Sequence, residues 1–372
     1  MGLPLTPLAA RLPSSVPFVG PEAQERAAGR PFRARLGANE SAFGPSHHAI
    51  DAMARAAGEV WRYGDPEAFA LRAAIAAHHG VAVERVAVGE GIDGLLQVVA
   101  RLFVGEGTPV VSSAGAYPTF NYHVAGFGGR LVLVPYRDDR EDLAALVEAA
   151  GRERAALVYV ANPDNPMGTW HDAAAVEAAV AALPEATVLC LDEAYGEFAP
   201  EGTLPAATLE HPRLVRLRTF SKAYGMAGAR IGYAITTREV ARAFNKVRNH
   251  FGVNRIAQEG ALASLGDAGH LARVRAEVEA AKARIAAVAL GHGLAPLASA
   301  TNFVTLDVGA DGATARALVA ALAARGVFVR MPFVPPQDRC IRVTAAPAEM
   351  LDVFEAELGP SLDHVRAARA AA

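Results

Sequence analysis

A lysine preceded by two hydroxyl side chains is the strongest chemical signal in this chain of 372 residues. Lys222 follows Thr219 and Ser221, and Arg230 comes eight positions later in a segment that contains several glycines. A lysine amine can form a Schiff base with a carbonyl group and, once released, can act as a general base. Two hydroxyl groups and a guanidinium group are suited to binding a phosphate. The segment therefore predicts amine chemistry next to a phosphate site.

A carboxylate upstream of this lysine completes the pattern. Asp192 lies at the end of an apolar run over 187–191, which is typical of a buried strand. The carboxylate is therefore expected at the C-terminal edge of a sheet. An amine, a carboxylate and a phosphate site together favour pyridoxal phosphate as the cofactor, because its pyridine nitrogen pairs with a carboxylate. Two simpler interpretations remain open, in which Asp192 caps a helix and Lys222 is an ordinary surface lysine.

A glycine-rich stretch between an expected strand and an expected helix offers a second phosphate site. From Gly89 to Gly94 the sequence reads G-x-G-x-x-G, which is typical of dinucleotide binding. That function also needs an acidic residue about 20 positions further on, and the chain has none there. The free N–H groups at such a helix N-terminus bind other phosphates as well. The backbone N–H groups of Gly91, Ile92 and Asp93 are therefore predicted to bind the cofactor phosphate.

Further short motifs are spread over nearly the whole chain. They are Asn39-Glu40 followed by Phe43-Gly44-Pro45-Ser46, then Tyr63-Gly64-Asp65-Pro66, Asn162-Pro163-Asp164-Asn165-Pro166-Met167-Gly168-Thr169 and Arg342-Val343-Thr344. Together with the segments around Asp192 and Lys222, these motifs resemble the fold-type-I aminotransferases, which depend on pyridoxal phosphate. Within that group, their order and gaps are most similar to those of the histidinol-phosphate aminotransferase branch.

Alternating apolar runs and helix-forming stretches predict an α/β fold with a largely parallel, doubly wound sheet. The expected strands are 86–88, 109–113, 131–135, 156–161, 188–191, 214–218 and 231–234. Long helices are expected over 238–251 and 268–292, followed by a smaller α+β region that ends in a helix over 347–358. The first forty residues are expected to be irregular. The resemblance implies fold type I, with a seven-stranded sheet. It also implies that the chain is divided into three parts. These are an N-terminal arm over 1–44 that belongs to the small domain, a large cofactor-binding domain over 45–280 and a small domain over 281–372.

The resemblance also implies roles for side chains around the cofactor. Lys222 forms the Schiff base, and Asp192 holds the pyridine nitrogen. Tyr195 and Asn165 contact the phenolic oxygen of the ring, and Tyr117 stacks on its face. The groups that hold the cofactor phosphate are the side chains of Thr219, Ser221 and Arg230, together with Tyr63 from the partner subunit of a homodimer. The chain departs from the family at Ile92, where a small residue is usual, and at Met167, where threonine is usual.

Two arginines near the C-terminus are the candidates for substrate binding. By resemblance, Arg342 binds the substrate α-carboxylate with help from Asn39, and Arg330 binds a phosphate at the far end of the substrate. A guanidinium group matches a carboxylate with two parallel hydrogen bonds. The segment after Arg330 is apolar and rich in proline, and it includes Phe333. Arg330 could therefore also be a surface arginine at the end of a strand.

The function that the resemblance implies is ping-pong transamination, with histidinol phosphate and 2-oxoglutarate converted to imidazole-acetol phosphate and glutamate. An aminotransferase for aromatic or other amino acids and a phosphothreonine-type decarboxylase remain alternatives, because specificity depends on a few side chains in the pocket. A nicotinamide-dependent oxidoreductase would use Gly89 to Gly94 but would leave Lys222 and Asp192 unexplained. A non-catalytic binding protein would not be expected to keep all of these residues.

The composition limits the range of partners and compartments. Charged residues make up 20% of the chain and the net charge is -3, which gives no footprint for nucleic acid or an anionic membrane. Two cysteines provide no disulfide framework, and together with the lack of a long apolar run they predict a cytoplasmic protein. The histidine pairs at 47–48 and 78–79 point to different faces of their helices, so no metal site is expected.

Overall fold

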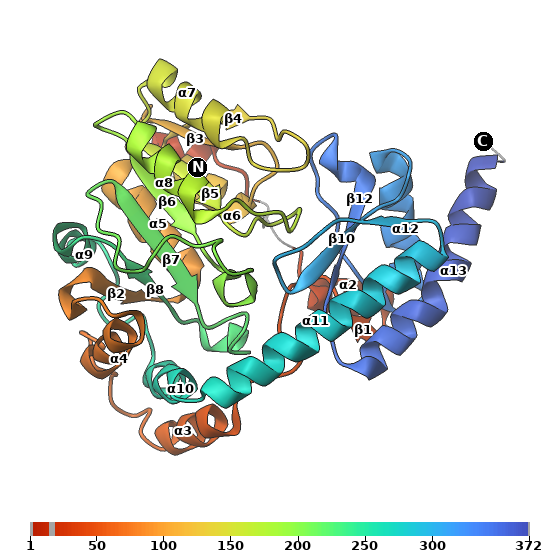
Figure 1. The fold of residues 1–372 in the computed structure, drawn as a ribbon, viewed down its shortest axis with the longest axis horizontal. Coiled ribbons are helices and arrows are strands. Elements are labelled where there is room, and N and C mark those ends of the chain that lie inside the picture. The colour runs from red at the N-terminus through yellow and green to blue at the C-terminus, as the bar shows by residue number, and fades with distance from the viewer. Residues whose placement is uncertain (1–2, 15–18, 371–372) are drawn as a thin grey trace.

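A seven-stranded sheet forms the centre of the larger part of the molecule (Figure 1). The computed structural model describes residues 3–14 and 19–370. The strands are β2 (Val86–Gly89), β3 (Pro109–Ser113), β4 (Arg130–Val134), β5 (Leu157–Ala161), β6 (Val188–Asp192), β7 (Leu214–Thr219) and β8 (Gly232–Ile235). Their spatial order is β2-β8-β7-β6-β5-β3-β4. Strand β8 is antiparallel to both neighbours and the other pairs are parallel. The predicted α/β class with a mostly parallel, doubly wound sheet is confirmed.

Helices cover both faces of this sheet because the strand side chains alternate between the two faces. The helices of this part are α3 (His47–Ala57), α4 (Phe69–His79), α5 (Gly91–Phe103), α6 (Pro118–Gly126), α7 (Leu143–Glu153), α8 (Ala173–Ala182), α9 (Arg238–Phe244) and α10 (Arg255–Leu265). Leu157 and Tyr159 of β5 join the apolar cluster that contains α5 and α6. Val158 and Val160 of the same strand join the cluster that contains α7 and α8. This alternation buries β5 on both sides.

A smaller part of the molecule follows the long helix α11 (Ala268–Gly291), which runs from one part to the other in Figure 1. It contains an antiparallel sheet in the order β12 (Cys340–Thr344), β10 (Phe303–Asp307), β9 (Ala295–Pro296). Helices α12 (Gly312–Ala324) and α13 (Ala348–Ala370) pack against it in a separate apolar core. The smaller α+β unit is therefore present as expected, although the exact domain boundaries stay a prediction.

The N-terminal arm is attached to this smaller part. Strand β1 (Ala34–Arg35) pairs in parallel with β11 (Val327–Phe328), and the side chain of Leu36 is buried in the core of the smaller part. The arm is less irregular than expected, because it also contains the short helices α1 (Pro7–Arg11) and α2 (Pro21–Ala28). Proline in the first turn starts both helices, since it is compatible with the first turn of a helix.

Two expected helices have different limits in the structure. The helix predicted over 238–251 ends at Phe244, and a new helix, α10, starts after Asn254, whose side chain accepts a hydrogen bond from the Ala257 N–H. The last helix was expected to end near Leu358, but α13 continues through Pro360. Buried apolar residues on both sides of the proline, including Leu362, tie the whole helix to the core. Tertiary packing thus outweighs the local signal to stop.

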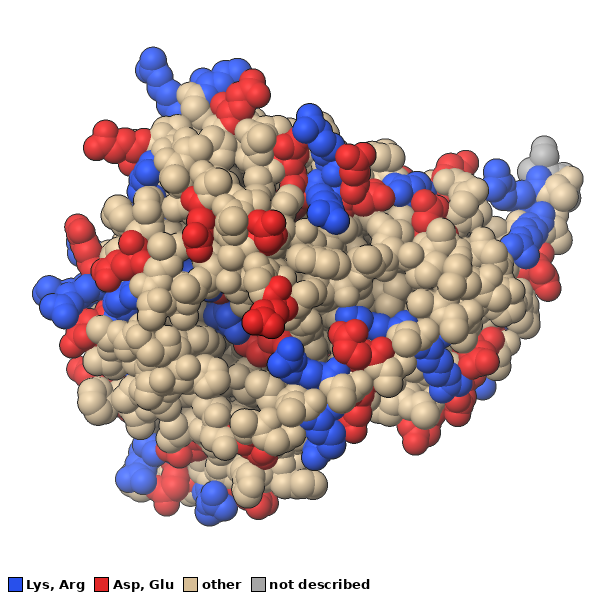
Figure 2. All heavy atoms as spheres, viewed as in Figure 1, with Lys and Arg blue, Asp and Glu red and all other residues tan. Residues whose placement is uncertain are grey.

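The sheet places the candidate residues along one edge. Asp192 ends β6, Thr219 ends β7, and α5 begins two residues after β2, at Gly91. The carboxyl ends of parallel strands meet at the same edge of such a sheet, which is where ligands bind in this class of fold. Within the described residues, no helix is both long enough and apolar enough to cross a membrane. Figure 2 shows acidic and basic side chains interspersed on the visible face, in keeping with the small net charge.

Candidate active site

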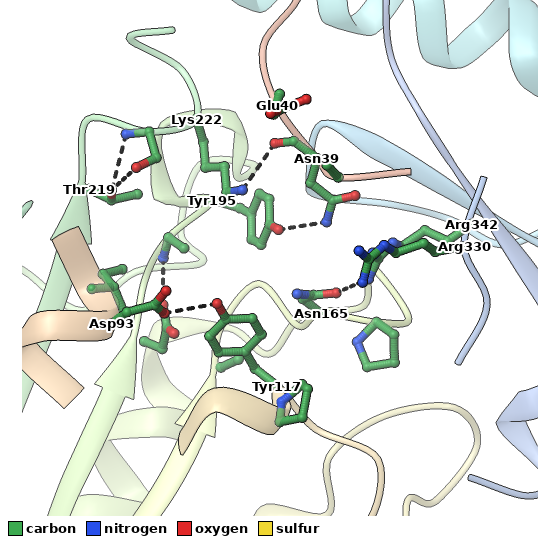
Figure 3. Close-up of a pocket in the computed structure, with 18 of the residues that line it drawn as sticks. Asn39, Glu40, Asp93, Tyr117, Asn165, Tyr195, Thr219, Lys222, Arg330 and Arg342 are labelled. Carbon is green, nitrogen blue, oxygen red and sulfur yellow. Dashed lines mark hydrogen bonds between the residues drawn. The ribbon is translucent and has the colours of Figure 1, made fainter. Parts of the chain in front are cut away.

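A pocket of about 430 Å³ opens between the edge of the large sheet, the arm and the smaller part. Three groups of residues line it: 37–40 of the arm, 330–333 with Arg342 of the smaller part, and a larger set from the large sheet and its loops. The predicted site residues on its wall are Asn39, Ile92, Asp93, Tyr117, Asn165, Asp192, Tyr195, Thr219, Ser221, Lys222, Arg230, Arg330 and Arg342. Figure 3 shows ten of the residues that line this pocket, with labels.

Lys222 extends from the loop after β7 into the centre of this pocket (Figure 3). Its Nζ donates a hydrogen bond of 3.1 Å to the backbone oxygen of Asn39 and lies 5.8 Å from the centre of the Tyr195 ring. Burial, together with the positive charge of Arg342, lowers the pKa of Lys222 to about 8. Roughly a tenth of this amine is therefore neutral at pH 7, a far larger share than at the ordinary pKa of lysine, and the neutral form is the one that a nucleophile or a base requires.

Asp192 is a buried carboxylate that two hydrogen bonds hold in place. Its Oδ2 accepts a hydrogen bond of 2.8 Å from the Tyr159 hydroxyl, and its Oδ1 accepts one of 3.0 Å from the Ala194 N–H. Burial raises the pKa of Asp192 to about 6. The carboxylate is therefore ionised at neutral pH and can pair with a cation in the pocket.

Groups suited to a phosphate gather where α5 begins. Gly91 has a φ of +75°, and a Cβ there would lie 2.7 Å from Nη2 of Arg230, so glycine lets the guanidinium group approach the helix N-terminus. Thr219 and Ser221 are held together, since the Thr219 Oγ1 donates to the Ser221 Oγ at 2.9 Å and accepts from the Ser221 N–H at 3.0 Å. Asp93 in the first turn of α5 accepts a hydrogen bond of 2.9 Å from the Tyr117 hydroxyl.

Asn39 connects the arm to the side chains deeper in the pocket. Its Nδ2 donates to the Tyr195 hydroxyl at 2.8 Å, and its Oδ1 accepts from the Thr344 hydroxyl at 3.2 Å. Burial raises the pKa of Tyr195 to about 12, so this hydroxyl stays protonated. Asn165, in turn, accepts a hydrogen bond from Nη1 of Arg342.

The two candidate substrate arginines lie side by side. Arg330 and Arg342 face each other across an isolated antiparallel β-bridge, and both side chains line the pocket. Burial and the neighbouring charge of Arg330 lower the pKa of Arg342 to about 10. Nη2 of Arg330 donates to the backbone oxygen of Val19 at 2.8 Å, and Nε of Arg342 is buried with no hydrogen-bond partner among the described residues. Two neighbouring cations of this kind are suited to an anion.

Two predicted residues do not line the pocket. Gly91 lies behind Arg230 and contributes backbone only. Tyr63 is 78% exposed on the outer surface, where its ring packs against Phe251 with centroids 4.8 Å apart. A role for Tyr63 at this pocket within the same subunit is therefore excluded by its position. Its predicted role in a partner subunit stays a prediction.

Sequence reasoning missed two side chains that belong to this site. Tyr159 lies inside the strand expected over 156–161 and was given no role, yet its hydroxyl donates a hydrogen bond to Asp192. The sequence signal that could have found it is a tyrosine hydroxyl within an otherwise apolar strand, because a buried hydroxyl needs a hydrogen-bond partner. Glu40 was noted only as part of a motif, but it lines the pocket next to Asn39. Among the described residues, no group of three or more His, Cys, Asp or Glu side chains is placed to hold a metal.

The residues present fit pyridoxal phosphate. A buried carboxylate, Asp192, suits the pyridine nitrogen, and Lys222 offers an amine with a lowered pKa. Where α5 begins, Gly91 leaves the space through which Arg230 reaches free backbone N–H groups, as a phosphate requires. The dinucleotide interpretation of the same glycines leaves Lys222 and Asp192 without a role.

Comparison with known proteins identifies the family. Residues 34–356 match the model for aminotransferase class I and II. The chain belongs to this family. It is 36% identical over 331 residues to histidinol-phosphate aminotransferase 1 of Nitrosococcus oceani, covering 88% of each chain. It is 38% identical over 333 residues to histidinol-phosphate aminotransferase of an Anaeromyxobacter species, covering 88% of this chain and 91% of that one.

A solved structure shares both the sequence and the fold of this aminotransferase. The crystal structure of histidinol-phosphate aminotransferase from Sinorhizobium meliloti, in complex with pyridoxal-5'-phosphate, is 52% identical to it. The TM-score is 0.96, and the match covers 98% of this chain and 99% of the other. The resemblance to fold-type-I aminotransferases that the motifs indicated is confirmed by these comparisons.

Proposed function

We propose that this protein is a pyridoxal-phosphate-dependent aminotransferase that transfers the amino group of histidinol phosphate to 2-oxoglutarate. The names of its relatives from Nitrosococcus oceani and Sinorhizobium meliloti support this choice of substrate. The observation that carries the proposal is the pair of adjacent arginines, Arg330 and Arg342, on one wall of the pocket.

The arginine pair suits a phosphate better than a single carboxylate. Histidinol phosphate has no α-carboxylate, and its phosphate arm occupies the corresponding position on the reacting carbon. A phosphate has more charge and more acceptor oxygens than a carboxylate, so it can bind two guanidinium groups at once. We therefore assign Arg330 and Arg342 jointly to the phosphate, in place of separate sites at the two ends of the substrate. The α-carboxylate of glutamate would use the same wall.

The remaining residues act on protons and orientation. When bound, the cofactor supplies a carbonyl group for the amine and a ring that accepts electrons. Lys222 then removes the proton from the substrate carbon that bears the amino group, which its lowered pKa favours near neutral pH. Asp192 would keep a positive charge on the pyridine nitrogen, and Asn165 and Tyr195 would hold the phenolic oxygen of the ring. Tyr117, which lines the same pocket, would stack on the face of the ring.

We also propose that the enzyme is a cytoplasmic homodimer with a shared site. Large apolar side chains are exposed together near the loop before α4, namely Val60, Trp61, Tyr63, Phe69 and Phe251. Monomeric proteins rarely expose such groups in one region, so this surface supports a contact between subunits. In the dimer, the Tyr63 hydroxyl would reach the cofactor phosphate of the partner subunit.

An aminotransferase for aromatic amino acids is the second candidate. The side of the pocket that carries Arg330 and Arg342 also has an apolar section that could receive an aromatic ring. It consists of Met331, Pro332 and Phe333. Glutamate formation from 2-oxoglutarate separates the two functions, with histidinol phosphate, histidinol and phenylalanine as alternative donors. We expect kcat/KM to be highest for histidinol phosphate, by about a hundredfold or more over histidinol, because a buried charge pair would be lost. Equal rates with the phosphorylated and unphosphorylated donors would contradict the proposal.

A further inference from the structure

Three carboxylates line the pocket, and two of them have partners. Asp192 accepts hydrogen bonds from Tyr159 and Ala194, and Asp93 accepts one from Tyr117. The third, Glu40, lines the pocket as an exposed residue, and its carboxylate makes no hydrogen bond or ion pair with the other described residues. Its charge acts on the pocket, because it favours the protonated forms of Lys222 and Arg330.

The backbone around Glu40 holds it at a fixed place. Asn39, the preceding residue, is buried and has a φ of +56°. Nδ2 of Asn302 donates to the backbone oxygen of Asn39 at 3.1 Å and to that of Glu40 at 3.4 Å. Figure 3 shows Glu40 next to Asn39, on the side of the pocket that holds Lys222 and away from Tyr117. The backbone of Glu40 is therefore held at the pocket wall, and its exposed side chain is available to a ligand there.

The imidazole ring is the one polar group of histidinol phosphate to which no residue of the pocket has been assigned so far. In the proposed function, Lys222 acts at the carbon that bears the amine, and Arg330 with Arg342 binds the phosphate. The imidazole ring then remains, and it carries an N–H donor that needs an acceptor once it leaves water. A carboxylate is the strongest such acceptor, because the hydrogen bond is charge-assisted.

We propose that Glu40 is the specificity-determining residue for the imidazole ring, which donates its N–H to the Glu40 carboxylate. This assignment rests on the proposed function. The same assignment also predicts how the pocket binds glutamate, the second amino donor. The γ-carboxylate of glutamate is repelled by Glu40 and is attracted to Arg330, so the two donors place their side chains differently.

The assignment predicts effects of opposite sign on the two donors. Glu40→Gln keeps the shape of the side chain and removes its charge. We expect the KM for histidinol phosphate to rise about tenfold, which corresponds to the loss of charge assistance in one hydrogen bond. The KM for glutamate should fall severalfold, because a repulsive charge is removed. Glu177→Gln, on the exposed face of α8, is the matched control and should change neither value.

A substrate analogue tests the partner of Glu40 directly. Phenylalaninol phosphate replaces the imidazole with a phenyl ring, which has no N–H donor. The native enzyme should prefer histidinol phosphate to this analogue by kcat/KM, and Glu40→Gln should lose about a factor of ten of that preference. An effect of Glu40 exerted through Lys222 would change both donors equally and would cancel in the ratio.

The outcomes test the role of Glu40 separately from the proposed function of the enzyme. Opposite shifts in the two KM values, together with a reduced preference for imidazole, would support the assignment. Unchanged KM values, or equal losses on both donors, would overturn it while the native enzyme still acts on histidinol phosphate. A native enzyme with no activity on histidinol phosphate would overturn the proposed function, and the role of Glu40 would fall with it.

Discussion

The two walls of the pocket are built in different ways. The cofactor wall consists of strand ends and the loops that follow them, so Asp192 and Thr219 are positioned by the hydrogen-bonded ladder of the large sheet. The substrate wall brings together Asn39 of the arm and Arg342 of the smaller part, which lie far apart in the sequence. Hydrogen bonds between Asn39 and Thr344 join these segments. The cofactor residues thus depend on local backbone, and the substrate residues depend on long-range packing.

Buried ion pairs stiffen the cofactor wall from behind. Glu193, next to Asp192, pairs with Arg216 of β7 at 2.8 Å, and Arg218 pairs with Glu197 at 2.6 Å. All four side chains are at least nine-tenths buried. Breaking such a pair costs about 3–5 kcal/mol, because one charge is left without a partner inside the protein. The segments that carry Asp192 and Lys222 are therefore held against each other by more than the sheet alone.

Removal of the amine should have the largest effect. Lys222→Ala is expected to lower kcat by at least about a thousandfold, because the base that moves the substrate proton is lost. The protein should remain folded, since among the described residues the Lys222 Nζ makes a single hydrogen bond, to the backbone oxygen of Asn39. Circular dichroism and a turnover assay measure the two effects, with the exposed Lys246→Ala as control. Turnover at the native rate would refute the assignment.

The substrate wall should also influence the cofactor wall. Arg342→Met is expected to lower kcat/KM about a hundredfold for both histidinol phosphate and glutamate, through loss of charged hydrogen bonds. The charge of Arg342 also lowers the pKa of Lys222, so this variant should raise that pKa above its value of about 8. The pH dependence of the rate of cofactor binding reports the change, because the neutral amine is the reactive form. An unchanged profile would show that the two walls act independently.

Asp192→Asn should weaken the cofactor wall alone. We expect affinity for pyridoxal phosphate to fall about twentyfold, since the charge that pairs with the pyridine nitrogen is lost. Burial raises the pKa of Asp192 to about 6, so in the native protein cofactor affinity should decline below that pH as the carboxylate becomes protonated. Fluorescence titration at several pH values would test this, and the variant should lack that part of the decline. A native pH profile in Asp192→Asn would contradict the pairing.

Arg330→Met should affect the substrate wall selectively. The KM for histidinol phosphate is expected to rise about tenfold, whereas the KM for histidinol should change little, because the phosphate is the group that we assign to Arg330. Steady-state kinetics with the two donors separate these effects. An equal rise in KM for both donors would mean that Arg330 only stabilises the local structure, through the hydrogen bond from its Nη2 to the backbone oxygen of Val19.

The smallest expected effect tests the contribution of a partner subunit. Tyr63→Phe should lower cofactor affinity about threefold, through loss of one neutral hydrogen bond to the phosphate. Tyr122→Phe removes a hydroxyl from another exposed tyrosine and should have no effect. Equilibrium titration with pyridoxal phosphate would measure both. Equal affinity in the two variants would argue against a site shared between subunits.

The sequence was most informative for the cofactor wall. The strand expected over 109–113 coincides with β3, and the residues around Lys222 and Asp192 do line one pocket, because their placement follows from strand ends. The hydroxyl of Tyr159 could not be assigned, since the choice between core and site depends on which carboxylate lies opposite. The relation between Arg330 and Arg342 depends on a β-bridge between distant segments, which no local pattern reveals.

The absorption spectrum of the purified enzyme with bound pyridoxal phosphate, recorded as single donors are added, tests the central claim most directly. We expect an absorption band of the Lys222-linked cofactor that bleaches with histidinol phosphate and with glutamate, but not with histidinol or phenylalanine at the same concentrations. Bleaching that is as strong with histidinol or phenylalanine would contradict the assignment of the arginine pair to a phosphate. The absence of any cofactor band would contradict the account of the cofactor wall.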